Sequence, residues 1–398
     1  MFINEELKTP ITDSCDVLVC GGGFAGISAA LAAARQNKKV ILLEKGYILG
    51  GLGTSGLVTI YLPLCDGLGR QVSFGIAEEL FRLSVSMGAE DMYPENWLEG
   101  KGTKTEKDKR FEVKYNASLF AILAEELLVK EGVEILYGTY AVGVALKDGK
   151  IINVIIENKS GRQAISVKSA VDATGDCDIA KFANAPTENF KQGNVLAAWY
   201  YSLGKNGFRL NTLGFADLPD NQKGEGFKQD YLISRRFSGL SGRELSEQTI
   251  LSHKSTLNDI IKRRADDPDL IPTSIATIPQ IRMTRRIVGE YTLDDTEMHK
   301  FFSDSIGLVS DWRKRGPVYE VPFGTLYSKE VRNLICAGRC TSVTDSMWDI
   351  MRVIPCCAVT GEAAGTAASM TDDFASLDIS ALQEKLKQNG VIIHENDL

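Results

Sequence analysis

The sequence predicts an α/β fold built on a βαβ unit near the start of the chain. Three consecutive segments predict it: a short apolar strand at residues 17–20, an Ala-rich helix at residues 27–36, and a second apolar strand at residues 40–43. Apolar runs of strand length on either side of a helix are typical of parallel strands joined by a crossover helix. We therefore expect a Rossmann-like nucleotide-binding domain.

The connection between the first strand and the helix carries a glycine pattern with a physical purpose. Gly21, Gly23 and Gly26 have the spacing G-x-G-x-x-G, and Glu44 ends the second strand 18 residues after Gly26. The first glycine permits a tight turn, the second lets a pyrophosphate approach the backbone, and the third lets helix and strand pack closely. The pyrophosphate would bind the free N–H groups at the start of the helix, and Glu44 would bind ribose hydroxyls. A glycine-rich turn without a ligand is the alternative.

A second glycine-rich stretch indicates which dinucleotide binds. Gly50, Gly51, Gly53 and Gly56 are crowded into the residues after Glu44, where a nicotinamide domain normally continues to its next crossover helix. Glycines let the main chain lie against a large flat ligand. The sequence therefore predicts FAD as the cofactor.

Composition and net charge limit the classes of protein to which the chain can belong. A chain of 398 residues with 44% hydrophobic and 24% charged residues is expected to form two globular domains, or one domain with an insertion. A net charge of −7 argues against non-specific nucleic-acid binding. The N-terminus lacks the apolar core of a signal peptide, and no run approaches the roughly 18 apolar residues of a membrane span. The eight cysteines lack zinc-ligand spacing, so we expect reduced thiols, no metal and a cytoplasmic protein.

Residues up to about 185 continue the nucleotide-binding pattern. We expect helices at 76–86 and 119–131, the second capped by Asn116 or Ser118, and a strand at 133–137. Three strands at 141–147, 151–157 and 163–167 form an antiparallel insert, because Asp148-Gly149 predicts a hairpin turn. A short strand at 171–173 then leads to Thr174 and Gly175. The charged stretch at 88–110 is expected to be solvated, with an anion-binding lid as the alternative.

The sequence pattern between residues 186 and 324 differs from that of the nucleotide-binding segments. Strands are expected at 199–204 and 285–293, a helix at 247–264 and a proline-punctuated connection at 270–279. The last segment returns to the first domain through a strand at 334–337, a turn at Gly338-Arg339, a loop and a helix after Pro355. We predict a discontinuous FAD-binding domain at 1–185 and 325–398, and a mixed α+β substrate domain at 186–324.

Together these motifs resemble a known family. GGGFAG at 21–26, LGGLGTSG at 49–56, AVDATGD at 170–176, IRMTRRIVGEYTL at 281–293 and the long segment from 333 to 368 resemble the FAD-dependent oxidoreductases labelled FAD_oxidored. That family is related to the glutathione-reductase-type and the succinate dehydrogenase/fumarate reductase flavoproteins. The resemblance implies a glutathione-reductase-type FAD-binding domain and a second, substrate-side domain.

The resemblance also implies roles for residues along the FAD molecule. The pyrophosphate contacts would be Gly21, Gly23, Phe24, Ala25 and Gly26. The contacts with the adenosine ribose, the adenine and the rest of the nucleotide would be Glu44, Lys45, Val142, Ala173, Thr174 and Gly175. The residues near the ribityl chain and the flavin ring would be Gly51, Thr54, Ser55 and Gly56, and the pyrimidine edge of the flavin would meet Ile354, Pro355 and Cys356. The C-terminal contact would come from Gly338 and Arg339.

Two positions depart from the family pattern. Asp345 follows Thr344 where many relatives have histidine, so a proton transfer made by that histidine would fall to Asp345 or to another group here. Cys356 occupies a position where threonine is usual. A thiol near a helix N-terminus can be reactive, but we favour a buried, inert cysteine. The helix after Pro355 would direct its positive end at the flavin and stabilise the anionic reduced form.

Arginines supply the other catalytic candidates. Strand alternation puts Arg282 and Arg286 on one face and Arg285 on the other. One face would bind a carboxylate or sugar hydroxyls of the substrate, and the alternative is salt bridging to Glu290 or Asp294. Asp345 and Arg352 fall between cofactor contacts. The three histidines, His253, His299 and His394, have no catalytic context and are expected on the surface.

The predicted function is hydride transfer between a small organic substrate, at a CH–OH or CH–NH group, and flavin N5. One alternative is an ene reductase, in which reduced flavin delivers hydride to an activated C=C and an arginine donates the proton. Another is a flavin-bound protein without catalysis that serves in binding or assembly. We expect a small-molecule substrate and no nucleic-acid or membrane partner, with the electron acceptor and the oligomeric state left open.

Overall fold

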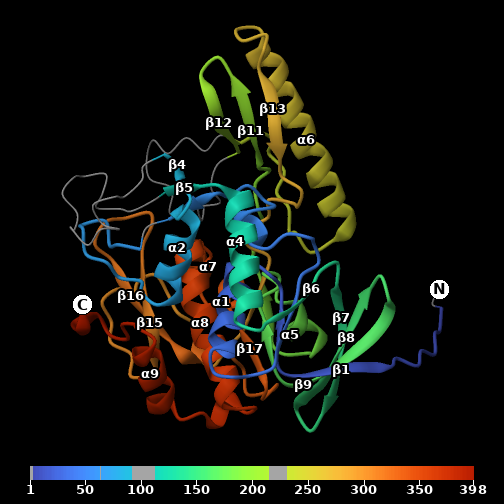
Figure 1. Ribbon diagram of the computed structural model, residues 1–398, viewed down its shortest axis with the longest axis vertical. Helices are drawn as coiled ribbons and strands as arrows, with labels where there is room; N and C mark the ends of the chain where they lie inside the picture. Colours follow the sequence, from blue (N-terminus) through green and yellow to red (C-terminus); the bar gives the residue numbers. More distant parts are fainter. Residues whose placement is uncertain (1–2, 63, 92–112, 215–230) are drawn as a thin grey trace.

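The computed structural model describes residues 3–62, 64–91, 113–214 and 231–398 (Figure 1). A seven-stranded sheet runs in the order β6-β2-β1-β9-β8-β7, with β17 paired to β9. Its strands are β1 (Ile11–Cys20), β2 (Val40–Leu43), β6 (Glu134–Leu136), β7 (Tyr140–Lys147), β8 (Lys150–Asn158), β9 (Gly161–Asp172) and β17 (Leu334–Cys336). All of these strands come from residues 11–172 and 334–336, and the predicted domain boundaries at 185 and 325 stay a prediction.

The predicted βαβ unit is confirmed. β1 and β2 pair in parallel from Val17 with Val40 to Cys20 with Leu43, and α1 (Phe24–Ala34) connects them. β6, β2, β1, β9 and β17 are parallel neighbours, so their carboxyl ends meet at one edge of the sheet. β1 begins at Ile11, earlier than expected, because its polar first residues pair with β9.

The antiparallel insert forms, but it is continuous with the main sheet. The two strands predicted at 163–167 and 171–173 are one strand, β9, which pairs with β8 along its first half and with β17 at its end. Lys168 and Ser169 do not interrupt it, because the buried Ser169 hydroxyl donates a hydrogen bond of 2.8 Å to the Thr371 carbonyl.

Helices α1 and α8 (Ile354–Met370) form the closest helix pair of the core. A Cβ on Gly361 would lie 2.3 Å from the Ala25 carbonyl oxygen, and one on Gly365 would lie 2.1 Å from that of Ala29. Glycine at these two positions therefore lets the helix backbones touch. Two further predicted helices, α2 (Ile76–Val85) and α4 (Ala117–Lys130), pack into the same core. Asn116 is the cap of α4, since its side chain accepts a hydrogen bond from Leu119 N.

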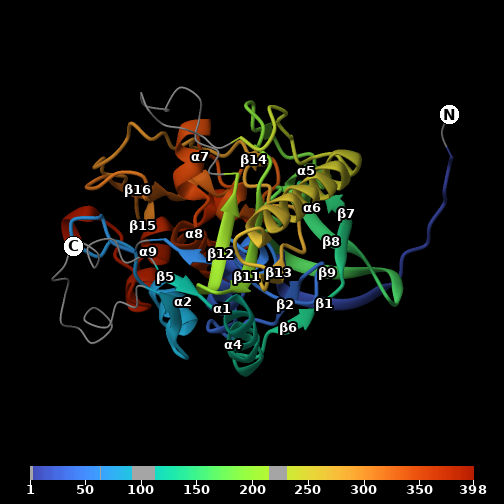
Figure 2. The same cartoon turned by 90° about the horizontal axis from the view of Figure 1, so that it is seen from above.

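Smaller sheets and helices complete the described chain. A three-stranded sheet, β12-β11-β13, and α6 (Gly242–Arg264) project from the body as an arm (Figures 1 and 2). The remaining strands are β3 (Ile60–Tyr61), β4 (Ala89–Asp91), β5 (Val113–Tyr115), β10 (Thr187–Asn189), β11 (Ala198–Gly204), β12 (Gly207–Leu213), β13 (Ile271–Ile275), β14 (Arg285–Ile287), β15 (Ser305–Ser310) and β16 (Val318–Pro322). The remaining helices are α5 (Asp178–Phe182), α7 (Asp345–Met351) and α9 (Ile379–Gln388).

Three predictions in this part are wrong. The strand expected at 285–293 is only the three residues of β14, because the chain then turns away to pair its backbone with residues near 324 and 327. The connection at 270–279 contains β13, an edge strand of the arm. The loop before Pro355 contains α7, which begins where the Thr344 side chain accepts a hydrogen bond from Met347 N.

Other predictions concern features outside the sheets. Most of the charged stretch at 88–110 lies outside the described residues. All eight cysteines are free thiols, as expected. Within the described ranges, no helix combines the length and apolar character that a membrane crossing needs.

Candidate functional site

A pocket of about 250 Å³ lies where the loops after the parallel strands converge. Each of five strands sends its following residues into the lining: 21–23 after β1, 44–46 after β2, Thr139 after β6, 173–175 after β9, and Ala337 with Arg339 after β17. In open α/β sheets the crevice beyond the carboxyl ends of the strands is where ligands bind. The topology thus gathers most of the predicted nucleotide contacts.

The glycines of this turn have two roles: Gly21 and Gly26 are required by the fold, whereas Gly23 leaves space for a ligand. Gly21 has φ 109°, and a Cβ there would lie 2.4 Å from the Ala173 carbonyl oxygen. A Cβ on Gly26 would lie 1.8 Å from the Gly21 carbonyl oxygen. Gly23 differs, because its φ is −73° and no described atom lies within 4 Å of a Cβ built on it. A Cβ at Gly23 would therefore enter open space at the start of α1, where a pyrophosphate fits.

Glu44 is fixed at the next loop. Its Oε2 accepts a hydrogen bond of 2.9 Å from Gly22 N, and its Oε1 accepts one of 2.7 Å from Gly46 N. A carboxylate has about four acceptor positions, so each oxygen keeps capacity for another donor. A buried carboxylate held in this way fits two ribose hydroxyls.

The far wall of the pocket comes from chain outside the main sheet. Its apolar residues are Gly239, Leu245, Ile278, Pro279 and Ile281. Arg339 joins this wall to the sheet edge: its Nη1 donates to the carbonyls of Ile281 (2.8 Å) and Arg282 (2.9 Å). Gly175 lies against the same guanidinium, since a Cβ there would lie 2.2 Å from Nη2 of Arg339.

Comparison with known proteins identifies the family of the chain. The FAD dependent oxidoreductase family matches residues 16–198 and 239–386. The chain belongs to this family. FAD is its cofactor, and the Gly23 opening and the Glu44 carboxylate provide a cradle that fits its pyrophosphate and ribose.

Individual relatives match only parts of the chain. A vinyl phenol reductase from Lactiplantibacillus plantarum is 29% identical over 190 residues, covering 41% of this chain and 38% of the relative. Dihydrolipoyl dehydrogenase 3 from Haloarcula marismortui is 24% identical over 263 residues, covering 64% of this chain and 47% of the relative. The chain thus matches less than half the length of each. Among solved structures, p-nitrophenol 4-monooxygenase from Pseudomonas putida has a TM-score of 0.47 at 12% identity, covering 95% of this chain and 85% of that one.

Most of the predicted FAD contacts line this pocket. Those that do are Gly21, Gly23, Phe24, Ala25, Glu44, Lys45, Gly51, Ser55, Ala173, Thr174, Gly175, Arg339 and Ile354. Those set behind the lining or beside it are Gly26, Thr54, Gly56, Val142, Gly338, Pro355 and Cys356. Val142 is the extra residue of a bulge in β7, and its neighbours Tyr140 and Ala141 line the pocket instead. The contacts themselves stay a prediction.

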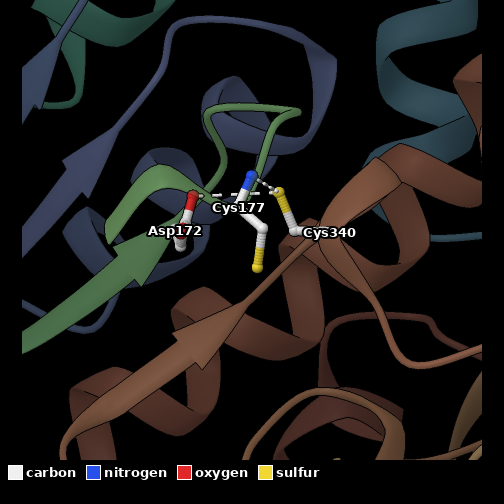
Figure 3. Close-up of side chains that lie close together, drawn as sticks. All are labelled: Asp172, Cys177 and Cys340. Atoms are coloured by element: carbon white, nitrogen blue, oxygen red, sulfur yellow. Dashed lines mark hydrogen bonds between the residues drawn. The ribbon is translucent and has the colours of Figure 1, made fainter. Parts of the chain in front are cut away.

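A buried cluster supports the loop after β9 (Figure 3). Donor atoms of Asp172, Cys177 and Cys340 lie within 4.8 Å of one another, as metal ligands could. Each has a protein partner, however: Asp172 accepts hydrogen bonds from Thr174 Oγ1 (2.7 Å) and Ala180 N (3.0 Å), and Cys177 N donates to Cys340 Sγ (3.2 Å). Figure 3 shows the Cys177 sulfur pointing away from the other two groups. We assign the cluster the role of fixing this loop, and the absence of a metal stays a prediction.

Positive charge gathers beside Ile354, where α8 begins. Pro355 lies in the first turn of this 17-residue helix, and the free N–H groups there carry the positive end of the helix dipole. Arg352 lines the pocket just before it and donates from Nε to Asp349 Oδ1 at 3.0 Å. Asp349 is fully buried and lies 3.8 Å from Nη1 of Arg313. The chain thus holds one arginine at the site through a buried ion-pair network.

The surroundings of the two adjacent cysteines at this helix start disfavour their thiolate forms. Burial raises the pKa of Cys356 well above its usual value and raises the pKa of Cys357 to about 12. Cys357, not Cys356, reaches the pocket, and its thiol donates to the Arg352 carbonyl at 3.3 Å. These findings favour the buried, unreactive cysteine over the reactive one.

The other catalytic candidates pair with one another behind the pocket. Nη1 of Arg286 lies 3.4 Å from Asp345 Oδ1, its Nη2 lies 2.9 Å from Glu188 Oε2, and its guanidinium stacks 5.0 Å from the ring of Trp348. Burial lowers the pKa of Arg286. Arg286 and Asp345 do not line the described pocket. Trp348 links Arg286 and Asp345 to the pocket, since its Nε1 donates a hydrogen bond of 2.9 Å to the carbonyl of Arg339.

Arg282 and Arg285 have different surroundings, and strand alternation does not apply to Arg282 because it lies before β14. Arg282 is buried, with its guanidinium 5.1 Å from the Trp199 ring, while Arg285 pairs with Asp178 at 2.6 Å. Arg282, like Arg286, lies outside the lining of the described pocket. In the described part of the chain, these arginines do not pair with the expected partners, Glu290 and Asp294. Glu290 pairs with Lys329 instead.

Some pocket residues were missed. Asp176 and Asp178 follow the Ala-Thr-Gly turn directly, so their position could have been read from the motif. Burial, together with the charges of Asp176 and Asp172, raises the pKa of Asp178 to about 6. Ile278 and Pro279 were expected only as part of a connection, and the motif at 281–293 did not indicate that Ile281 lines the pocket. His253 and His299 are exposed and His394 is half-buried, and none of the three lines the described pocket.

Proposed function

We propose that this protein transfers a hydride between a small organic substrate, at a CH–OH or CH–NH group, and N5 of FAD. The observation that carries the proposal is the continuity of the pocket, which runs from the nucleotide loops to an apolar wall of Leu245, Ile278, Pro279 and Ile281. A nucleotide site alone needs no such wall. Bound FAD supplies two-electron hydride chemistry.

The residues of this chain have distinct tasks in the proposal. Glu44 and the start of α1 hold the nucleotide, and Arg352 with the start of α8 provides fixed positive charge. Such preorganised charge is most effective at a site sheltered from water. Arg352 would also attract an anionic group of the substrate, because its guanidinium lines the pocket and is held there by Asp349.

We propose a positioning role for Arg286 and Asp345. Their ion pair and the Trp348 ring fix α7, which leads directly to Arg352. A change at either residue would act on the site through α7 and Trp348. Neither residue needs to touch the substrate for this role.

A second candidate function is reduction of an activated C=C bond. The segment of 29% identity with a vinyl phenol reductase favours it. In that reaction Arg352 would orient the substrate's electron-withdrawing group, and an arginine would supply the proton, as the sequence analysis expects.

Anaerobic flavin spectroscopy separates the two candidates. Oxidised protein is titrated with hydroxy acids, amines and sugar derivatives, and photoreduced protein is titrated with enones and vinyl phenols. We expect a substrate from the first panel to bleach the flavin. Reoxidation by the second panel alone would overturn the oxidation and support ene reduction, and a protein inert to both panels would contradict both. The Gly23→Val variant serves as the control that lacks bound FAD.

A further inference from the structure

Three consecutive residues after β15 support the arginine that lines the pocket just before α8. The guanidinium carbon of Arg352 lies 5.9 Å from the centre of the Trp312 ring, and Trp312 Nε1 donates a hydrogen bond of 2.9 Å to the Asp349 carbonyl. Arg313 approaches the same aspartate, since its Nη1 lies 3.8 Å from Asp349 Oδ2. We call Asp311, Trp312 and Arg313 the 311–313 segment. None of its three residues lines the described pocket.

The carboxylate of Asp349 is shared between two arginines. Its Oδ1 accepts hydrogen bonds from Nε (3.0 Å) and Nη2 of Arg352. Its Oδ2 faces Arg313 and is buried without a hydrogen-bond partner among the described residues. The Asp349 side chain is fully buried, and those of Arg313 and Arg352 are 8% and 9% exposed. Because a buried carboxylate requires nearby positive charge, Arg313 and Arg352 balance Asp349 together.

Arg313 is itself held by two further carboxylates. Its Nε donates a hydrogen bond of 3.1 Å to Asp311 Oδ1, and its Nη2 lies 3.3 Å from Asp311 Oδ2 and 3.6 Å from Asp295 Oδ2. Its Nη1 donates a hydrogen bond of 3.5 Å to the carbonyl of Ser346 on α7, the helix that carries Asp349. Arg313 therefore fastens the loop after β15 to α7.

We propose that Arg313 is a positioning residue for Arg352. Its charge offsets that of Asp349, so Asp349 orients Arg352 without cancelling the attraction of Arg352 for an anion. Asp349 engages Nε and Nη2 of Arg352, and within the described chain no residue accepts a hydrogen bond from Nη1. Nη1 is thus the nitrogen that would meet a substrate anion. The proposal rests on the anion-binding role proposed above for Arg352.

Trp312 has a complementary part in this arrangement. Its ring restricts the Arg352 guanidinium, because an arginine over an aromatic face gains a cation–π attraction. Its hydrogen bond to the Asp349 carbonyl fixes the main chain near the end of α7. Without Arg313, Asp349 would be balanced by Arg352 alone. Arg352 would then attract an anion less strongly.

Benzoate is a suitable probe because it joins a carboxylate to an apolar ring. FAD-loaded protein is titrated with benzoate, and binding is followed by the change in flavin absorbance. We expect the wild type to bind benzoate, and Arg352→Met and Arg313→Met to weaken binding by about tenfold or more. The control is Arg35→Met. Arg35 also bridges two carboxylates, Glu79 and Glu131, but it lies outside the pocket lining, so its loss leaves benzoate affinity unchanged.

Arg313→Lys separates a role of charge from a role in packing. The lysine keeps the positive charge and is expected to recover most of the benzoate affinity that Arg313→Met loses. A purely structural role would recover little, because lysine cannot reproduce the paired contacts of Arg313 with Asp311. Arg313→Lys binding benzoate as weakly as Arg313→Met would overturn the proposal.

Trp312→Phe tests the same support without removing a charge. It keeps a ring but loses the hydrogen bond to the Asp349 carbonyl, and it is expected to weaken benzoate binding by about two- to tenfold at unchanged FAD content. If Arg313→Met takes up no FAD, Trp312→Phe decides the question. Wild-type affinity in Trp312→Phe would then overturn the proposal.

The remaining outcomes distinguish the positioning role from the proposed function. Wild-type affinity in both Arg313→Met and Trp312→Phe, with loss of binding in Arg352→Met, would overturn the positioning role and leave the anion site at Arg352. Benzoate binding that survives in Arg352→Met, or is absent from the wild type, would overturn the anion site and the positioning role together. The expected benzoate pattern in a protein whose flavin no hydroxy acid or amine reduces would contradict the proposed hydride transfer and support the positioning role.

Discussion

The backbone amide of Gly22 donates a hydrogen bond of 2.9 Å to Oε2 of Glu44, which ties the glycine turn to the end of the second strand. The same carboxylate accepts a second hydrogen bond from Gly46 N. Glu44 is therefore oriented before any ligand binds. This pre-organisation lowers the entropy cost of holding a ribose.

Replacing Glu44 is expected to weaken FAD binding rather than folding. Glu44→Ala removes acceptors of charge-assisted hydrogen bonds, each worth about 1.5–3 kcal/mol, so FAD affinity falls by about 10- to 100-fold. Fluorescence titration of the apoprotein with FAD measures the change. Glu44→Gln, which keeps one oxygen, is expected to lie between the two proteins. Wild-type affinity in Glu44→Ala would show that the ribose lies elsewhere.

The contact between α1 and α8 predicts a severe cost for one added methyl group. A Cβ on Gly365 would lie 2.1 Å from the Ala29 carbonyl oxygen, so the helices would have to separate. Gly365→Ala is expected to lower the free energy of unfolding by about 1–3 kcal/mol, although alanine favours the helix. Gly242→Ala, where no described atom lies within 4 Å, is the matched control and is expected to be neutral or stabilising. Urea unfolding of both variants checks the difference, and equal effects would contradict the close packing.

A buried carboxyl group makes stability depend on pH. Glu362 on α8 accepts a hydrogen bond of 2.7 Å from Ile76 N, and burial raises its pKa from 4.5 to about 8. The folded protein therefore holds this proton more tightly than the unfolded chain does. The contribution of Glu362 to the free energy of unfolding is fully present below pH 4.5 and is lost as the pH rises through about 8. The loss is at most about 1.4 kcal/mol per pH unit.

Glu362→Gln isolates this contribution. The variant keeps a side chain that can accept from Ile76 N, but it cannot titrate. The free energy of unfolding, measured by urea at several pH values, is expected to fall less steeply with rising pH in Glu362→Gln than in the wild type. Parallel pH profiles would show that Glu362 does not titrate in this range.

Three variants distinguish a residue that lines the pocket from residues that only position other groups. Arg352→Ala removes one of the cations that line the pocket and is expected to slow flavin reduction by at least about tenfold, as loss of one preorganised charge does. Arg286→Ala and Asp345→Ala are expected to leave FAD bound and to slow reduction less. Anaerobic stopped-flow with the best substrate measures all three rates. Loss of FAD from the Arg286 or Asp345 variant would show that these residues hold the cofactor instead.

The sequence predicted the parts of the fold whose signals are local. The βαβ unit, α2 and α4 follow from periodicity, glycine spacing and the Asn116 cap, all within a few residues. The continuity of β9 could not be predicted, because Ser169 is satisfied by the Thr371 carbonyl, 202 residues away.

The candidate site likewise has one half that the sequence predicts and one half that it does not. Its nucleotide half follows strands that the sequence marks clearly. The wall at Ile278–Ile281 has no regular structure, and long-range contacts hold it: Thr277 N donates to the Ser55 carbonyl at 2.8 Å, and Gln280 Nε2 donates to the Gly56 carbonyl at 2.6 Å. Such contacts depend on the folded chain and leave no local pattern. The partners of Arg282, Arg285 and Arg286 were missed for the same reason.

The most direct test of the account is the FAD content of Gly23→Val after reconstitution, measured beside that of the wild type. Gly23 has an ordinary φ and open space beyond its Cα, so valine is expected to leave the apoprotein's unfolding temperature unchanged while blocking the pyrophosphate position. The account predicts a yellow wild-type protein with stoichiometric FAD and a folded, colourless variant. A variant that binds FAD as the wild type does, or a wild-type protein that takes up no flavin, would contradict it.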